Sequence, residues 1–160
     1  MNWIKRRAGA ALGLLVAGAF TLPCDAAPYT WSGGGSNGLW SNGSNWLGGT
    51  AVPTTGTHSV IYNNNVNTTG TLSAQYRIDA LQFTSTAGAH TINSAGSGSL
   101  LMRGNITNAS TNTQTINALL SYPSSGSFTV GGSGNVALNG PISSPSGSTV
   151  TLTAVGSGTV

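Results

Sequence analysis

The chain has 160 residues, which is enough for one domain with a modest hydrophobic core. Charged residues make up only 4% of it and the formal net charge is +3, while Gly, Ser, Thr and Asn together account for just over half of the residues. This composition excludes coiled coils and helical bundles, which need Ala, Lys and Glu in helical repeats. It also excludes a nucleic-acid-binding protein, because no basic face can be built.

The N-terminus has the pattern of a secretory signal peptide. Three basic residues at positions 5–7 precede an apolar stretch at residues 8–20, which is too short to span roughly 30 Å of hydrocarbon as a helix. Cleavage is expected after Ala26, where small residues stand at both −3 and −1; a cut after Ala27 is the less favourable choice. We therefore predict a signal peptide that delivers the chain to the export machinery, with an uncleaved membrane anchor as the alternative.

Removal of residues 1–26 would change the properties of the remaining chain. The charged residues left are Arg77, Arg103 and Asp79, so the formal net charge falls to +1. Cys24, the one cysteine, is lost as well, which leaves no disulfide and no thiolate metal ligand. Stability outside the cell would then depend on backbone pairing and packing alone.

After residue 27 the sequence has the pattern of short β-strands joined by turns. Helix formers are scarce, and Gly, Asn, Ser or Pro bounds each apolar or β-branched run. Several of these runs alternate with a period of two, as half-buried strands do. We expect strands over residues 59–62, 77–83, 90–92, 99–102, 113–120, 127–130, 136–138 and 149–153.

An internal repeat with an offset of 36 residues relates these runs. When the Gly-Ser-Gly at residues 96–98 is placed over that at 132–134, Leu100 aligns with Val136, and a third Gly-Ser-Gly follows at 156–158. Recurring short strands and Gly-rich corners predict a chain wound into a solenoid. With about 20 residues in each coil, the repeat would span about two coils.

We therefore predict an all-β fold, a right-handed parallel β-helix over residues 59–160 that is incomplete at its C-terminus. Gly and Asn suit its corners, and stacked Thr, Ser and Asn side chains can form ladders between coils. Stacked like charges would repel, which agrees with their scarcity. A β-sandwich and a disordered linker are the alternatives, although regularly placed Val, Leu, Ile and Phe disfavour the linker.

The segment at residues 27–58 differs from the rest because it contains Trp31, Trp40 and Trp46. Each indole can bury about 150–250 Å². One interpretation is a cap that shields the first coil of the solenoid, which needs such a cover. The other is a carbohydrate-binding site, in which exposed Trp rings stack on sugars.

A series of short motifs extends from this segment to the C-terminus. They are Trp31-Ser32-Gly33, Leu39-Trp40-Ser41, Asn45-Trp46, Val60-Ile61-Tyr62, Ile78-Asp79-Ala80-Leu81-Gln82-Phe83, Leu138-Asn139-Gly140-Pro141-Ile142 and Leu152-Thr153-Ala154-Val155-Gly156. Over residues 29–160 this series resembles bacterial proteins with autotransporter-associated β-strand repeats, also called passenger-associated transport repeats. The resemblance implies an exported β-helical passenger at the cell surface, the outer membrane or the extracellular space, in some members followed by an outer-membrane β-barrel that these 160 residues do not include.

The sequence provides little for catalysis or cofactor binding. The segment after the predicted signal peptide has one carboxylate side chain, Asp79, so a paired-carboxylate glycosidase cannot be built from it. No Gly-x-Ser-x-Gly elbow places a strained Ser between a strand and a helix. His58 and His90 have no metal-ligand spacing, and both are expected in turns or at strand edges. Arg77 is expected to share a strand face with Asp79. We therefore predict no catalytic residue, no metal site and no cofactor.

Taken together, these patterns predict a non-enzymatic passenger segment with a structural or adhesive role. Its expected partners are the export machinery and a surface polysaccharide or a host or matrix ligand. Two alternatives stay open: a carbohydrate-binding module that uses the three Trp residues, and the N-terminal part of a larger secreted carbohydrate-active enzyme. An end of the solenoid left uncovered is expected to pair with other chains.

Overall fold

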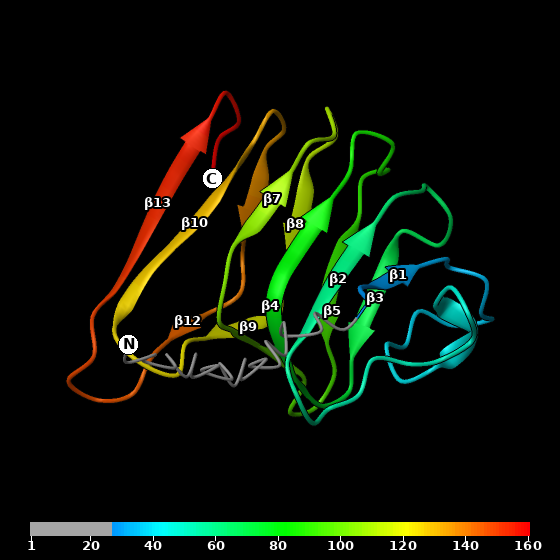
Figure 1. The fold of residues 1–160 in the computed structure, drawn as a ribbon, viewed down its shortest axis with the longest axis horizontal. Helices are drawn as coiled ribbons and strands as arrows, with labels where there is room; N and C mark the ends of the chain where they lie inside the picture. Colours follow the sequence, from blue (N-terminus) through cyan, green and yellow to red (C-terminus); the bar gives the residue numbers. More distant parts are fainter. Residues whose placement is uncertain (1–26) are drawn as a thin grey trace, which may run out of the picture.

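The computed structural model describes residues 27–160, and the predicted signal peptide with its cut after Ala26 lies outside this range. The described chain is a parallel β-helix of about four coils, which confirms the predicted fold class (Figure 1). A short 3-10 turn, Gly43–Asn45, lies in the N-terminal segment. The strands are β1 (Tyr29–Trp31), β2 (His58–Tyr62), β3 (Thr69–Leu72), β4 (Gln75–Phe83), β5 (Thr91–Ser94), β6 (Ser99–Met102), β7 (Ile106–Asn108), β8 (Gln114–Ile116), β9 (Leu119–Ser121), β10 (Gly126–Gly132), β11 (Val136–Leu138), β12 (Ile142–Ser143) and β13 (Val150–Gly156).

Strands from successive coils lie on one another in three parallel stacks. Stack 1 contains the start of β4, then β6, β9 and β12. Stack 2 contains β2, the end of β4, β7, β10 and β13, with β1 on the outer edge of β2. Stack 3 contains β3, β5, β8 and β11. The chain passes through the three stacks in turn, so every coil adds one layer to each.

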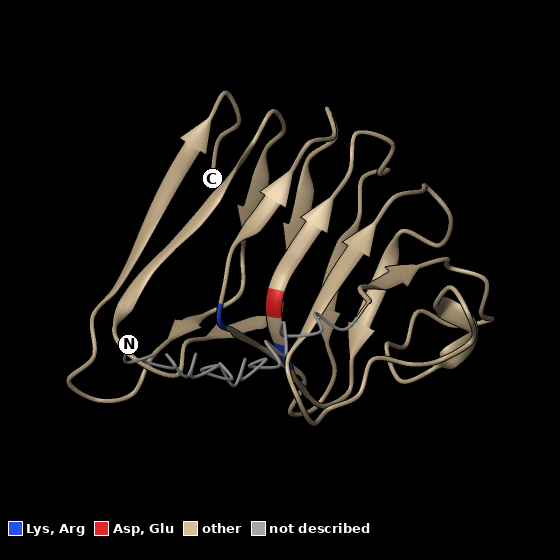
Figure 2. Cartoon of the chain, viewed as in Figure 1, with Lys and Arg blue, Asp and Glu red and all other residues tan. Residues whose placement is uncertain are grey.

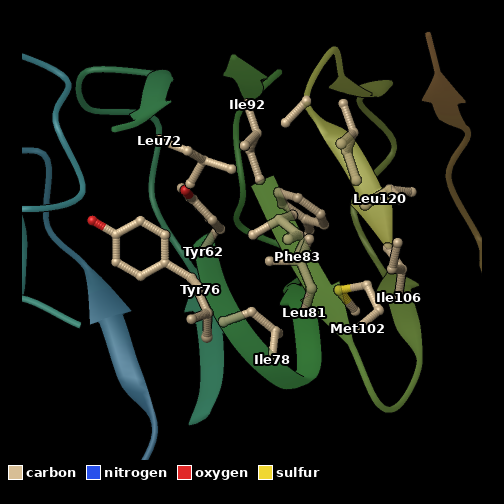
Figure 3. Close-up of a cluster of buried hydrophobic side chains, with 14 of the residues drawn as sticks. Tyr62, Leu72, Tyr76, Ile78, Leu81, Phe83, Ile92, Met102, Ile106 and Leu120 are labelled. Atoms are coloured by element: carbon tan, nitrogen blue, oxygen red, sulfur yellow. The ribbon is translucent and has the colours of Figure 1, made fainter. Parts of the chain in front are cut away.

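The side chains that point inward from these stacks form continuous rows along the axis (Figure 3). In stack 2 one row contains Val60, Leu81, Ile106 and Val130, and each of them is fully buried. Stack 1 contributes Tyr76, Leu100 and Leu120, and stack 3 contributes Ile92 and Ile116. Because inward residues recur at every second position of a strand, the short apolar runs of the sequence are sufficient to build this core.

The prediction that a 36-residue repeat spans two stacked coils is wrong. Leu100 pairs with Leu120, 20 residues on, and Leu81 pairs with Ile106, 25 residues on, so one coil takes 20–25 residues. An offset of 36 residues is therefore about one and a half coils, and it aligns Leu100 in stack 1 with Val136 in stack 3. Inward and outward residues alternate on both strands, so the two runs match in pattern although they lie in different stacks.

The Gly-Ser-Gly motifs occupy two different corners of the coil. Gly132 pairs directly with Gly156, and the amide N–H of Gly158 donates to the Gly132 carbonyl at 3.2 Å, so the second and third motifs are stacked. The first motif, residues 96–98, instead turns the chain between β5 and β6. A coil with several tight corners needs glycine at more than one of them. A Gly-Ser-Gly motif therefore indicates a corner but does not identify which corner of the coil it forms.

The outer surface carries few charges, as Figure 2 shows. Within residues 27–160 the charged side chains are Arg77, Asp79 and Arg103. An asparagine ladder follows the edge of stack 3: the Asn117 amide donates to the Asn93 oxygen at 2.8 Å, and the Asn139 amide donates to the Asn117 oxygen at 3.1 Å. This confirms the expectation that neutral polar side chains stack between coils.

Candidate functional site

The three Trp residues predicted as a cap or a sugar site form one cluster at the N-terminal end. Trp31 ends β1, and an antiparallel bridge joins it to Trp46, which follows the 3-10 turn. The ring of Trp46 meets those of Trp31 and Trp40 edge to face, with centroids 5.1 and 5.2 Å apart. This is a favoured geometry for aromatic pairs, so the cluster is stabilised by more than the burial of its area.

All three indole N–H groups have hydrogen-bond acceptors. Trp31 donates to the Asn67 carbonyl at 3.1 Å, and Trp46 donates to the Trp40 carbonyl at 2.8 Å. Trp40 donates to the hydroxyl of Tyr62 at 3.0 Å. Burial raises the pKa of Tyr62 far above its usual range, so this hydroxyl stays neutral. The three Trp side chains are therefore buried and each of their indole N–H groups is hydrogen-bonded. We call Trp31, Trp40 and Trp46 the Trp plug.

The cluster closes the inner rows of the solenoid. The Trp31 ring lies 5.6 Å from that of Tyr62 in stack 2, and the Trp40 ring lies 5.2 Å from that of Tyr76 in stack 1. In stack 3 the plug approaches the backbone of Gly70, where an added Cβ would lie 2.8 Å from the Trp40 indole nitrogen. The prediction of a Trp-rich cap is therefore confirmed.

The alternative role of Trp31, Trp40 and Trp46 in sugar stacking is corrected by their burial. Their side chains are 0%, 0% and 2% exposed, so no ring presents a face to solvent. Sugar stacking needs an open aromatic face. The faces of these rings already pack against the end of the hydrophobic core. The three Trp residues therefore form a cluster, as their spacing indicated, but none of them can stack on a sugar.

The shape of the cap depends on a buried residue that the sequence did not single out, Asn45. Its amide nitrogen donates to the carbonyls of Asn37 and Leu39 at 2.6 and 2.9 Å, and its oxygen accepts from the amide N–H of Gly35 at 2.9 Å. These three bonds hold the loop that carries Trp40 and Trp46. One more Asn in an Asn-rich chain gives no sequence signal, since only its burial distinguishes it.

A second group of buried polar side chains lies where the chain passes from stack 2 to stack 3, and we call it the polar corner: His90, Asn108, Ser110 and Gln114. The Gln114 oxygen accepts from the amide N–H of His90 at 2.9 Å, and its nitrogen donates to the Gly88 carbonyl at 2.9 Å. Gln114 thus links two successive coils.

The other members of the polar corner make the same kind of bond. Ser110 donates to the Ala87 carbonyl at 2.7 Å, one coil before it, and Asn108 donates to the Asn135 carbonyl at 2.8 Å, one coil after it. The side chains therefore satisfy turn carbonyls that strand pairing does not reach. Their role is to stack the corners, and they contain no acid–base pair.

His90 differs from the expected strand-edge histidine because it is only 1% exposed. Its Nε2 lies 2.7 Å from the Asn64 carbonyl and so carries the proton of that bond, while its Nδ1 is buried without a partner. Burial lowers the pKa of His90, although the bond to Asn64 opposes this in part. His58 does lie at a strand edge, as predicted: it is the first residue of β2, and its ring lies 2.8 Å from the Thr55 carbonyl.

Two shallow hollows mark the described surface. One, of about 200 Å³, lies at the corner between stacks 1 and 2 and is lined by Arg103, Met102, Tyr122, Phe128 and residues 123–127. The other, of about 210 Å³, lies beside the cap and is lined by Leu47, Val66 and neighbouring residues. Neither hollow contains a carboxylate or a histidine.

The charged residues do not assemble into a reactive group. Arg77 and Asp79 both lie on the outer face of β4, which confirms the prediction that they share a face. Among the described residues there is no group of three or more His, Cys, Asp and Glu side chains placed to hold a metal ion. In residues 27–160 there is also no helix with the length and apolar character needed to cross a membrane.

Comparison with known proteins identifies no relative. No family model matches the chain, and no curated protein or solved structure matches it either. Its fold and the features of its two ends are therefore the basis for any functional inference.

Proposed function

We propose that the chain is an exported, non-enzymatic β-solenoid segment of an autotransporter-like bacterial surface protein, with a structural or adhesive role. The observation that carries the proposal is a stack of nearly uncharged parallel coils closed at its N-terminal end by the Trp plug. Each coil needs only its neighbours, so the rod can grow coil by coil from a closed end. Such a rod suits a chain that crosses a membrane unfolded and folds afterwards.

The distribution of chemistry in the described residues agrees with a structural role. Asp79, the one carboxylate side chain there, lies on the outer face of β4, and a glycosidase needs two carboxylates across a bond. The buried polar groups are used in bonds between coils. An adhesive role would use the outer faces, which display mainly Thr, Ser and Asn hydrogen-bonding groups.

Export is the part of the proposal that is tested most directly. The full chain would be produced in a bacterium with two membranes, the cell fractions separated, and the N-terminus of the recovered protein determined by mass spectrometry. We expect a chain that begins at Ala27 and lies outside the cytoplasm. A matched control replaces the positive residues at positions 5–7 with Glu, which should keep the chain in the cytoplasm. Recovery of an unprocessed chain in the cytoplasm in both cases would overturn the proposal.

A further inference from the structure

The corner between stacks 1 and 2 becomes longer from one coil to the next. The strand pairings make residues 77–81, 101–106, 121–130 and 143–154 equivalent passages around this corner. The passage at 121–130 is therefore four residues longer than the one at 101–106, and the extra residues have no counterpart in the coil before them. The hollow of about 200 Å³ lies at this step, between Met102 and Arg103 of the shorter passage and residues 122–128 of the longer one.

This hollow lies between coils and not at an end of the rod. The amide N–H of Tyr122 donates to the Ser143 carbonyl at 3.0 Å, and Gly126 pairs with Val150. The coil that follows therefore already covers the longer passage. The hollow lies on its other side, against Arg103 of the coil before it.

One edge of β10 is unpaired beside the hollow. β10 begins at Gly126, but its pairing with β7 begins only at Val130. Just before that point the Thr129 N–H donates to the side-chain oxygen of Asn105 at 3.0 Å. Because the N–H groups of successive residues in a strand point to opposite edges, Ser127, which lines the hollow, directs its N–H to the same edge as Thr129. No residue of β7 pairs with Ser127, so this donor is available to a ligand.

Arg103 is the one charged residue that lines the hollow, and its side chain is exposed. Asp79, the one carboxylate side chain in residues 27–160, does not line it. A planar guanidinium group presents paired N–H donors that bind a carboxylate through two parallel bonds. The charge of the hollow therefore selects an anion, and the shape of the guanidinium group favours a carboxylate.

Tyr122 supplies an unused hydrogen-bond donor in the wall of the hollow. Its ring stacks on that of Phe128 with centroids 4.2 Å apart, and it is only 7% exposed. Its hydroxyl is buried and has no hydrogen-bond partner in the described chain. Burial raises the pKa of Tyr122, so the hydroxyl keeps its proton. A buried hydroxyl left unbonded costs stability, and an acceptor atom of a ligand would remove that cost.

The other polar groups of the lining and the size of the hollow narrow the class of ligand. Ser124 and Ser127 are exposed, and each hydroxyl can both donate and accept a hydrogen bond. The hollow is smaller than the pockets of about 300–1,000 Å³ that hold drug-sized ligands, so it admits one ring-sized unit. A matching ligand has one carboxylate, several hydroxyls and the size of one sugar ring.

We propose that this hollow binds a hexuronate, a sugar acid with one carboxylate. The carboxylate pairs with Arg103, and the sugar hydroxyls bond to the hydroxyl of Tyr122 and to Ser124 and Ser127. A peptide C-terminus fits less well, because its last side chain would need an apolar pocket where the hollow presents serines. The site goes beyond the proposed function and does not depend on export, so either one can fail while the other stands.

The test is a titration of the full chain, expressed from Met1 and labelled with ¹⁵N, followed by nuclear magnetic resonance at constant ionic strength. D-glucuronate and D-galacturonate are the probes, and we expect saturable shifts confined to residue 103 and residues 122–128, with a Kd on the order of 1 mM for at least one of them. D-glucose and acetate each carry half of the chemistry and should bind at least about tenfold more weakly. A trimer of galacturonate distinguishes the two sources of the ligand: tighter binding than the monomer indicates a unit of a polysaccharide, and equal binding indicates the free sugar acid.

Three variants test the assigned contacts. Arg103→Gln should weaken hexuronate binding about tenfold or more, while Arg77→Gln, which removes the same charge from the outer face of β4, should leave it unchanged. Tyr122→Phe should weaken binding about threefold or more without lowering the urea midpoint, because it deletes a hydroxyl that the folded chain leaves unbonded.

Several results would overturn the proposal. They are the absence of saturable shifts with both hexuronates, acetate or a short peptide that binds as tightly as they do, and equal losses in the Arg77→Gln and Arg103→Gln variants. A Tyr122→Phe variant that binds like the wild type would remove that hydroxyl from the site.

Discussion

The two ends of the rod are built from the same inner rows but finish them differently. At the N-terminal end the rows meet three indole rings that are at most 2% exposed, and every indole N–H is bonded. At the C-terminal end the same rows finish in Ile142 and Leu152, which are 45% and 38% exposed. A coil in the middle of the rod is covered by a neighbouring coil on each side, whereas a coil at an end has one side uncovered. The side chains that cover an end must therefore differ from those that the coils repeat.

The difference is visible in composition as well as in burial. The capped end contains the Trp cluster and buried Asn45, residues that are rare or unremarkable elsewhere in the chain. The open end, residues 140–160, contains the Gly, Ser, Thr, Pro and aliphatic residues of an ordinary coil. An end is therefore recognised as capped when its side chains could not be stacked into a further coil.

The largest test of this contrast is truncation of one residue at each end. Trp40→Ala removes a buried ring and its bond to Tyr62, and we expect the free energy of unfolding to fall by about 3–5 kcal/mol. Leu152→Ala, at the open end, should cost less than about 1 kcal/mol because its side chain is partly in water already. Urea unfolding followed by far-ultraviolet circular dichroism measures both. Equal costs would show that the ends do not differ energetically.

A smaller test adds one methyl group under the plug. Gly70→Ala would place its Cβ 2.8 Å from the Trp40 indole nitrogen and 3.0 Å from the Tyr62 hydroxyl, so the cap must shift. We expect a loss of about 1–3 kcal/mol in unfolding free energy by the same measurement. Gly126→Ala is the matched control: no atom lies within 4 Å of its added Cβ, and the expected change is at most a slight gain. A neutral Gly70→Ala variant would mean that the plug is loosely packed.

The strand pattern shows how much of the fold could be predicted from the sequence. The aliphatic runs at residues 59–62, 77–83 and 99–102 correspond to β2, β4 and β6 because period-two alternation is a local signal. β3 was missed since Gly70 interrupts its apolar pattern, and that glycine is required by Trp40, which is distant in sequence. The predicted strand at residues 113–120 is in fact two strands, β8 and β9, on different stacks.

The candidate sites were less predictable than the strands. The Trp cluster is visible as composition, but whether an indole is buried or exposed depends on what the first coil places beneath it. The polar corner had no signal, because Asn108, Ser110 and Gln114 are ordinary residues in this sequence. They become distinctive only once the coil length of 20–25 residues is known, and the 36-residue repeat had concealed that length.

A fall in pH is expected to lower the free energy of unfolding through a group in the N-terminal half of the rod, His90. The pKa of His90 is lowered by burial, so the folded chain keeps this ring neutral while the unfolded chain takes up a proton near pH 6.5. Stability is therefore fully present above that pH and falls as the pH drops toward the folded value. The loss is at most about 1.4 kcal/mol per pH unit for one proton.

The measurement compares urea midpoints at neutral and mildly acidic pH for the wild type and His90→Gln. His90→Gln should flatten the dependence on pH, because the His90 ring is buried against the core. Residues 104–160 contain no His, Asp or Glu, so the open half has no comparable group. A wild-type chain whose stability is constant across this range would show that His90 is not held neutral by the fold.

The smallest change in the free energy of unfolding should come from the asparagine ladder. There the same substitution can be made at two positions along the rod, so the effect of position can be measured with the side chain held constant. Asn117→Ala removes two ladder bonds, one to Asn93 and one from Asn139, whereas Asn139→Ala, next to the open end, removes only the latter. Since an exposed hydrogen bond contributes at the low end of about 0.5–1.5 kcal/mol, Asn117→Ala should cost about twice as much as Asn139→Ala. Equilibrium unfolding in urea resolves the difference if both variants keep the wild-type slope. If the two costs are equal, the ladder does not act as a continuous chain of bonds, and the middle of the rod gains nothing from these side chains that its open end lacks.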